Sequence, residues 1–258
     1  MKKYAKDLLV AAVEHPHQLY VLLKLTDTQP LPEMRPGQFV EVKIEGSPTT
    51  FLRRPISINY VDRANNQLWL LVKKAGDGTR QLATLQPGDK LNLVFPLGNG
   101  FSPVKRAGER VLLVGGGVGV APLLDYGKYL KDNGAQPIFL LGARSTTDLL
   151  ELDMFERIAP LHITTEDGSQ GEKGFVTQHS LLKHDTFDRI SVCGPKPMMV
   201  SVARYAKQAN IPCEVSLENM MACGLGACLC CVEKTVKGNV CVCKEGPVFD
   251  INDLTWTI

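Results

Sequence analysis

The pattern of apolar and polar residues divides the chain into two regions of different periodicity. From Lys6 to Phe95, short runs of alternating apolar and polar residues are separated by turn signals such as Pro36-Gly37 and Pro87-Gly88. Such alternation between closely spaced turns is typical of antiparallel strands. The pattern predicts strands at residues 8–13, 19–25, 39–44, 56–60, 68–73 and 91–95. Together they are expected to form a small antiparallel Greek-key barrel.

After Phe101 the pattern changes to buried apolar runs that alternate with helical segments. Strands are predicted at residues 110–114, 137–141, 161–165, 189–193 and 214–217, and helices at 123–131, 148–158 and 198–209. Strands with helices between them indicate a parallel sheet covered on both faces. The cysteine-rich end follows as a third segment. We therefore predict domains at residues 1–101, 102–217 and 218–258.

Composition and charge narrow the possible functions. The chain has 258 residues, of which 44% are hydrophobic, so it can bury a large core. Its formal net charge is +2, with acids and bases interspersed, which does not predict binding to nucleic acid or to a membrane surface. The first apolar run is too short for a signal peptide, and no run is long enough to span a membrane, so a cytoplasmic location is expected.

The eight cysteines point to metal binding, because disulfides are rare in a reducing compartment. Six of them lie between residues 223 and 243. The spacing C-x4-C-x2-C-x11-C is the plant-type spacing of a 2Fe-2S cluster. It selects four ligands: Cys223, Cys228, Cys231 and Cys243. Gly224, Gly226 and Ala227 leave room for backbone N–H groups to approach the sulfurs.

A structural zinc site is the alternative for these thiols. Cys228-x2-Cys231 is half of a zinc knuckle, but the second half would be Cys241-x-Cys243, which is too short a spacing. The corresponding function would be a zinc-containing, nucleotide-binding module that regulates a partner. Spacing therefore favours the cluster, and it leaves Cys230 and Cys241 with packing roles.

Two stretches of the barrel region suit a phosphate-bearing cofactor. Arg53 and Arg54 begin a strand beside Pro55, and paired guanidinium groups can bind a pyrophosphate, although they could also be a solvated charge pair. The strand through residues 70–72 leads into a glycine-rich turn and a predicted helix at 79–85, with Thr79 as the N-cap. Backbone N–H groups in such a turn can converge on an anion.

The first turn of the parallel sheet suits a dinucleotide. Residues 115–122 form a glycine-rich turn between a predicted strand and helix, where such a fold binds nucleotides. The strict G-x-G-x-x-G pattern fails, because Val120 or Pro122 stands where the third glycine should be. Arg144 could bind a phosphate of NAD or NADP, and Cys193, as a lone thiol ending a strand, could be a small buried residue.

The barrel segments resemble the flavin domain of the ferredoxin reductase family, in which the motif R-x-Y-S precedes a G-x-G-[ST] turn. Residues 54–57 and 76–79 match these motifs, with Ile56 in place of the tyrosine. The resemblance implies that the barrel binds FAD through Arg53, Arg54, Pro55, Ile56, Ser57, Leu70, Leu71, Val72, Gly76, Asp77, Gly78 and Thr79.

The middle segments resemble the nicotinamide domain of the same family. Its G-G-x-G-x-A-P turn matches residues 116–122, and further similarity covers 141–144, 165–169 and 193–198. The resemblance implies that NAD binds at Gly116, Gly117, Gly119, Ala121, Pro122, Arg144, Cys193 and Gly194, with Cys193 near the nicotinamide. It identifies no certain catalytic residue.

Over its full length the chain resembles the electron-transfer subunits of NAD-dependent dihydroorotate dehydrogenases. The motif S-L-E-x-x-M-x-C-G-x-G-x-C-x-G-C matches from Ser216 to Cys231, with Cys230 in place of the last glycine. The resemblance implies a subunit with FAD and a 2Fe-2S cluster that binds an FMN-containing catalytic subunit as a dimer of heterodimers. That catalytic subunit would convert dihydroorotate to orotate in pyrimidine synthesis. Related reductase subunits, of the sulfide dehydrogenase or electron-bifurcating transhydrogenase type, are the nearest alternatives.

Overall fold

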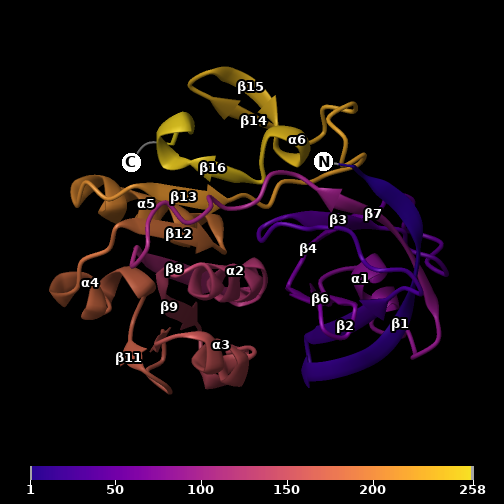
Figure 1. Cartoon of the computed structure of the whole chain (residues 1–258), viewed down its shortest axis with the longest axis horizontal. Coiled ribbons are helices and arrows are strands. Elements are labelled where there is room, and N and C mark those ends of the chain that lie inside the picture. The colour runs from indigo at the N-terminus through magenta and orange to yellow at the C-terminus, as the bar shows by residue number, and fades with distance from the viewer. Residues whose placement is uncertain (1, 257–258) are drawn as a thin grey trace. The chain divides into compact units, whose positions relative to one another are not determined.

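The computed structural model describes residues 2–256, which form two compact units (Figure 1). One unit comprises residues up to Gly100 together with Glu218–Glu233 and Asn239–Pro247. The other comprises Phe101–Leu217, Lys234–Gly238 and the end of the chain from Val248. The cysteine-rich segment, residues 218–258, is thus divided between the units.

The first unit is built on a curled antiparallel sheet of seven strands in the order β4-β3-β7-β1-β2-β6-β5. The strands are β1 (Tyr4–His17), β2 (Tyr20–Thr26), β3 (Phe39–Val42), β4 (Arg54–Ser57), β5 (Tyr60–Asp62), β6 (Gln67–Lys73) and β7 (Lys90–Leu97). Alternate residues fill the interior, as shown by Leu8 and Val10 of β1 and by Leu68, Leu70 and Val72 of β6. This two-residue period is the pattern from which the sheet was predicted, and the predicted fold class is confirmed.

One predicted strand of this sheet, residues 56–60, is wrong. Its residues belong to β4 and β5, which lie at opposite ends of the strand order. The N–H of Ile58 donates to Gln38 O (3.0 Å), whereas the N–H of Asn59 donates to Trp69 O (3.0 Å). The chain therefore passes from one edge of the sheet to the other between two adjacent residues, and so curls the sheet toward a barrel.

The second unit contains a seven-stranded sheet in the order β11-β10-β9-β8-β12-β13-β16, parallel except for β16. Its strands are β8 (Arg110–Gly116), β9 (Gln136–Ala143), β10 (Leu161–Thr165), β11 (Glu172–Lys173), β12 (Arg189–Cys193), β13 (Cys213–Ser216) and β16 (Val248–Asp250). The five predicted strands are confirmed with small differences at their ends. The strand order reverses direction beside β8, as in doubly wound nucleotide-binding sheets.

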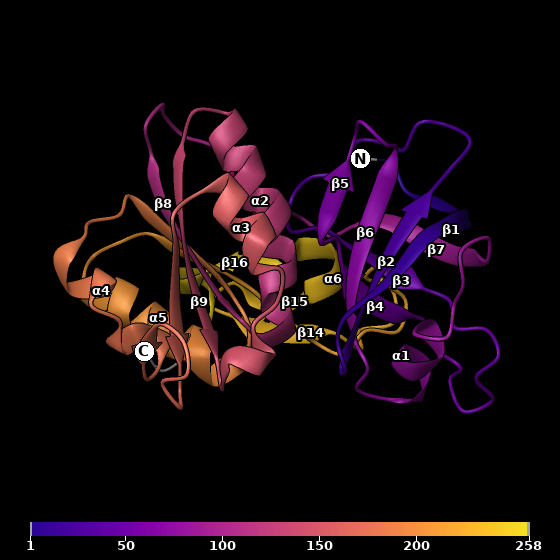
Figure 2. The same cartoon turned by 90° about the horizontal axis from the view of Figure 1, so that it is seen from below.

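Helices cover both faces of this sheet. They are α2 (Ala121–Asp132), α3 (Leu152–Ile158), α4 (Leu181–His184) and α5 (Lys196–Gln208). Figure 2 shows α2 and α3 on one face and α5 on the other, which follows from right-handed crossovers that leave β8 in opposite directions. The helix predicted at 148–158 begins only at Leu152, because Glu151, directly before α3, has a left-handed backbone conformation (φ +55°).

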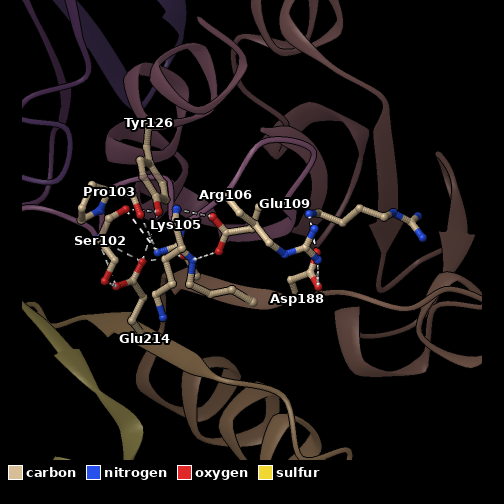
Figure 3. Close-up of polar contacts among 11 residues, drawn as sticks. Ser102, Pro103, Lys105, Arg106, Glu109, Tyr126, Asp188 and Glu214 are labelled. Carbon is tan, nitrogen blue, oxygen red and sulfur yellow. Dashed lines mark hydrogen bonds and ion pairs between the residues drawn. The ribbon is translucent and has the colours of Figure 1, made fainter. Parts of the chain in front are cut away.

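A polar network holds the segment before β8 against the amino-terminal edge of the sheet (Figure 3). The hydroxyl of Ser102 donates to the Glu214 carboxylate (2.7 Å), and the Tyr126 hydroxyl donates to Ser102 O (2.8 Å). Arg106 forms an ion pair with Asp188 (2.6 Å). The network lies at the amino ends of β8, β12 and β13, so it leaves the opposite edge of the sheet for ligands.

The cysteine-rich segment adds two short strands and one helical turn. These are β14 (Val232–Thr235), β15 (Gly238–Cys241) and α6 (Val242–Glu245). Asn99 fastens this region to the curled sheet, because its side-chain amide donates to Lys244 O (3.1 Å) and Glu245 O (3.0 Å). The thiols at residues 223–231 and 241–243 therefore belong to the compact unit that contains the curled sheet.

Candidate functional site

Two of the four predicted cluster ligands, Cys231 and Cys243, are neighbours in the structure. The N–H of Cys243 donates to Cys231 Sγ (3.4 Å). A 2Fe-2S cluster takes four thiolates, two at each iron, so these two sulfurs fit one iron. Among residues 2–256, no three His, Cys, Asp or Glu side chains are grouped so that they could hold a metal ion.

Backbone N–H groups point at the sulfurs of these ligands. Leu225 N lies 3.3 Å from Cys223 Sγ, and Gly226 N lies 3.1 Å from Cys243 Sγ. Burial opposes ionisation of Cys223, but N–H groups of Leu225, Cys228 and Ala227 together outweigh it and lower the pKa of this thiol to about 6. The surroundings of Cys223 therefore favour negative sulfur, which is the form that binds iron, whereas burial raises the pKa of Cys243 to about 12.

The glycines of the loop are required by its shape. Gly224 (φ +66°) and Gly226 (φ +82°) have left-handed backbone conformations that disfavour other residues. A Cβ at Gly224 would lie 2.6 Å from Glu41 Cγ, and one at Gly226 would lie 2.9 Å from Lys244 Cδ. Both glycines thus allow the loop to approach Glu41 and Lys244 closely.

The two thiols left out of the predicted ligand set have different surroundings. Cys230 is exposed, as is the predicted ligand Cys228. Cys241 is buried, and its Sγ lies 3.8 Å from Gly226 O. Cys231 and Cys243 are almost completely buried, with 2% and 1% of their surface exposed. Burial thus distinguishes the predicted ligand Cys231 from its exposed neighbour Cys230. It does not distinguish the predicted ligand Cys243 from Cys241, because both are buried.

Glu41 is a residue of this region that the sequence did not predict. It lies on β3 with no exposed surface, against Gly224 of the thiol loop. Neither carboxylate oxygen has a hydrogen-bond partner among the described residues. Burial raises the pKa of Glu41 to about 7, although Arg53 opposes the shift. The only signal in the sequence is an acidic residue alternating with Val40 and Val42, which ordinarily indicates a solvent-facing position.

Replacing Glu41 by glutamine is expected to change the pH dependence of stability. A carboxyl whose folded pKa is raised stabilises the fold only while protonated, so this contribution is lost as the pH rises from about 4.5 to about 7. Relative to wild type, Glu41→Gln should gain about 3 kcal/mol of unfolding free energy across that window. Denaturant titrations between pH 5 and 8 measure it. Exposed Glu33→Gln is the control, and parallel curves for wild type and Glu41→Gln would contradict the assignment.

The two arginines predicted to bind the FAD pyrophosphate differ in their contacts. Arg53 holds β3 and β7 together, because its guanidinium donates to Glu41 O (3.2 Å) and to the Asn92 side chain (2.6 Å). Within the described part of the chain, Arg54 donates from Nη1 alone, to the backbone oxygens of Leu52 (2.9 Å) and Arg53. The geometry therefore favours Arg54 over Arg53 as the phosphate ligand.

The glycine-rich turn precedes helix α1 (Asp77–Leu82), which begins earlier than predicted. The predicted N-cap is wrong: Gly76 is the N-cap, and Thr79 lies in the third helical position. The Thr79 hydroxyl accepts from Ala75 N (2.9 Å) and Gly76 N (3.0 Å), so those two amides are already paired. An anion bound at this turn would therefore contact the backbone N–H groups from Asp77 onward.

Part of β6 lacks a second strand partner. Strand β5 pairs with β6 over Gln67–Trp69, so within residues 2–256 residues 70–73 have a strand partner on the β2 side alone. The side chains of Leu70 and Val72 are buried in the core, and Ile56 packs against it. These residues could therefore contact a flavin through backbone atoms and edges of side chains. The predicted FAD residues fit the cofactor in this respect.

Replacing Gly76 by alanine is expected to reduce flavin binding without affecting the fold. A Cβ at Gly76 would have no protein atom within 4 Å, and its φ of −143° suits any residue. The added methyl group would instead occupy the space predicted for the cofactor. We expect flavin content to fall while the thermal unfolding temperature changes by no more than a few degrees. Full flavin content would place the cofactor elsewhere.

The predicted NAD residues meet at the carboxyl edge of the parallel sheet. In the strand register Cys193 is opposite Gly115, Gly116 is opposite Gly142, and Thr165 is opposite Ala143. The ends of β8, β9, β10 and β12 are therefore level with one another. Ligands of open parallel sheets bind at this edge.

The glycine turn touches the end of β12. A Cβ at Gly119 would lie 2.5 Å from Gly194 Cα and 2.6 Å from the carbonyl carbon of Cys193, so only glycine fits. Gly117 has φ +56°, and a Cβ there would meet open space. Ala121 and Pro122 begin α2 directly after the turn, Arg144 is exposed just past β9, and Cys193 is buried. The structure thus brings these residues to one edge of the parallel sheet.

Comparison with known proteins defines the class first. The family model "Oxidoreductase NAD-binding domain" matches residues 113–204. A chain of an NADH-dependent reduced ferredoxin-NADP oxidoreductase, solved in a study of flavin-based electron bifurcation, is 30% identical with a TM-score of 0.87, covering 96% of this chain and 90% of that chain. The ferredoxin reductase of carbazole 1,9a-dioxygenase shares the fold, at 20% identity and a TM-score of 0.68, covering 82% of this chain and 68% of that chain. The protein is an oxidoreductase of the ferredoxin reductase-like class.

The particular family follows from three further matches. The model "Iron-sulfur cluster binding domain of dihydroorotate dehydrogenase B" matches residues 218–255. The electron transfer subunit of dihydroorotate dehydrogenase B (NAD(+)) from Bacillus caldolyticus is 40% identical over 223 residues, covering 84% of this chain and 86% of that protein. The subunit from Shouchella clausii is 39% identical over 227 residues, covering 85% and 86%. The chain belongs to this family of electron transfer subunits.

Proposed function

We propose that this chain carries electrons between NAD(H) and an FMN-containing dihydroorotate dehydrogenase subunit, in pyrimidine biosynthesis. The observation that supports it best is the thiol loop, where backbone N–H groups donate to the sulfurs of three predicted ligands, Cys223, Cys231 and Cys243. Family membership agrees with this assignment. The cofactors would be FAD and a 2Fe-2S cluster, with NAD as substrate.

Each group of residues has its own part in this function. Gly117 and Gly119 would let the nicotinamide dinucleotide approach the carboxyl edge of the parallel sheet, and Arg144 would bind one of its phosphates. Arg54, Ser57 and the turn at residues 76–79 would orient FAD. When bound, FAD exchanges electron pairs with a nicotinamide and single electrons with a cluster, which is the conversion the relay needs. The four thiols would hold that cluster.

The thiol loop also has surface suited to a partner protein. Exposed apolar side chains lie in or beside it, at Met220 (83% exposed), Leu225 (48%) and Leu229 (64%). Such a group around exposed Cys228 fits protein contact at the point where electrons leave. The partner would be the FMN-containing subunit, assembled with this chain as a cytoplasmic dimer of heterodimers. Within residues 2–256, the structure contains no helix with the length and apolar character of a membrane span.

The isolated chain is expected to reduce an artificial acceptor with NADH but to leave dihydroorotate unchanged. Everything needed for NADH oxidation lies in this chain, whereas dihydroorotate oxidation is assigned to the partner. Absorbance assays with ferricyanide and with dihydroorotate plus NAD measure the two reactions, and the spectrum of the purified protein should show flavin and iron-sulfur bands. Turnover of dihydroorotate by the pure chain would refute the need for a partner, and a colourless zinc protein would refute the relay.

A second candidate is a reductase subunit of an electron-bifurcating complex. The likeness to the NADH-dependent reduced ferredoxin-NADP oxidoreductase covers 96% of this chain, which is more than the curated relatives cover. Sequence identity to this oxidoreductase is 30%, which is lower than the 40% identity to the subunit from Bacillus caldolyticus. Affinity purification from the source cells distinguishes the candidates by the subunit that is recovered with this chain.

A further inference from the structure

Phe51 and Leu52 place apolar side chains on the surface directly before the strand that carries Arg54. Phe51 is 93% exposed, more than any other large apolar side chain within residues 2–256, and Leu52 is 51% exposed. An aromatic ring has a large apolar surface, and leaving it in water gives up the stabilisation that burial would provide. A ring in this position is therefore suited to contact with a flat part of a ligand.

The turn that presents Phe51 is anchored on the side that faces the protein. The hydroxyl of Thr49 donates to Asp77 Oδ2 (2.9 Å). Thr50 is buried, and a Cβ at Gly78 would lie 3.0 Å from Thr50 Cγ2. Both contacts tie the turn to the beginning of helix α1. The ring of Phe51 is therefore carried by an anchored backbone.

Arg54, the favoured phosphate ligand, adjoins these apolar residues. Its Nη1 donates to Leu52 O (2.9 Å), so its guanidinium group lies against the residue that follows Phe51. Phe51 precedes Arg54 by three residues, so their Cα atoms can be at most about 11 Å apart. A ligand whose phosphate is bound by Arg54 therefore has the ring of Phe51 within its reach.

The order of these residues along the chain matches the order of the parts of FAD. In FAD the pyrophosphate lies between the flavin end and the adenosine end. Ile56, two residues after Arg54 on β4, belongs to the predicted contacts of the flavin ring. With the pyrophosphate at Arg54, an extended FAD places its adenosine on the opposite side of that arginine, where Phe51 lies.

We propose that the ring of Phe51 stacks on the adenine of FAD, and that this contact makes the chain bind FAD in preference to FMN. FMN shares the flavin ring and its first phosphate with FAD but has no adenosine. Bases stack readily on the faces of aromatic side chains, and the ring of Phe51 is exposed almost completely. The proposal rests on the assignment of FAD under the proposed function.

The test is to titrate FAD and FMN separately into the full chain after its flavin has been removed, with flavin fluorescence as the readout. Phe51→Ala should weaken FAD binding by a factor between about 5 and 100, which corresponds to the loss of one base-stacking contact. Its affinity for FMN should be unchanged. Phe51→Trp should bind FAD as wild type does, because an indole ring also stacks.

Phe175→Ala is the matched control, because it removes another exposed phenylalanine (61%) from the other compact unit. It should leave the affinities for FAD and FMN unchanged. The thermal unfolding temperature of both alanine variants should stay close to that of wild type, since neither ring is buried.

Unchanged FAD affinity in Phe51→Ala would overturn the inference and leave the proposed function intact. Equal wild-type affinities for FAD and FMN, or an equal loss of both in Phe51→Ala, would also overturn it, because the effect would not depend on the adenosine. Weaker binding of the FMN-containing subunit by Phe51→Ala at unchanged FAD affinity would make Phe51 a partner contact instead. Failure of the wild-type chain to bind either flavin would reject the proposed function itself.

Discussion

Replacing Cys231 by serine is expected to remove the iron-sulfur cluster, whereas replacing its neighbour Cys230 by serine is expected to leave the cluster in place. Cys231 is buried and contacts Cys243, and its sulfur accepts the N–H of Cys243 at 3.4 Å. Cys230 is exposed. The adjacent thiols therefore differ in location although the sequence places them side by side.

Iron analysis and the visible spectrum measure this difference. Wild type and Cys230→Ser should hold about two iron atoms per chain, and Cys231→Ser should hold close to none. Flavin content should be the same in all three proteins, since the predicted FAD residues lie outside the thiol loop. A cluster that survives in Cys231→Ser but is lost in Cys230→Ser would reverse the ligand assignment.

Replacing Gly119 by alanine is expected to abolish most use of NADH. The new Cβ would lie 2.5 Å from the backbone of Gly194, and backbone atoms on both sides leave no flexible side chain to move away. The glycine turn must then separate from the end of β12, which costs about 1–3 kcal/mol of stability. A displacement of about 1 Å at such a site lowers the rate about 100-fold.

Steady-state reduction of ferricyanide by NADH measures the loss in Gly119→Ala. Val118→Ala is the matched control, because it removes atoms from the same turn and adds none. Flavin and iron content should stay at wild-type levels, which shows that the effect is confined to the nucleotide turn. Unchanged NADH kinetics in Gly119→Ala would contradict the placement of NAD at this edge of the sheet.

Much of the fold could be predicted because its strands carry simple patterns. Four of the five predicted strands of the parallel sheet, β8, β9, β12 and β13, contain continuous buried runs, and the strands of the curled sheet bury alternate residues such as Leu8 and Val10. The cluster ligands were assigned from cysteine spacing, which reflects the chemistry of the cluster, and this assignment stays a prediction. Each of these signals is local, and each depends only on residues close in the sequence.

The features that were predicted wrongly, or not predicted at all, depend on contacts between residues that are distant in the sequence. The division of residues 56–60 between β4 and β5 follows from pairing with Gln38 and Trp69, which no local pattern reveals. Strand β16 joins the sheet edge by antiparallel pairing with β13 and carries no periodic signal of its own. The burial of Glu41 depends on a loop more than 180 positions away in the sequence, which covers a face that alternation assigns to solvent.

Electrons from dihydroorotate are expected to reach NAD through this chain and its thiol loop. The most direct test is to co-express the chain with a candidate FMN-containing subunit and to follow NADH formation from dihydroorotate and NAD. We predict turnover by the complex, none by either subunit alone, and none by a complex that carries Cys231→Ser. NADH formation at the wild-type rate by the Cys231→Ser complex would contradict the account.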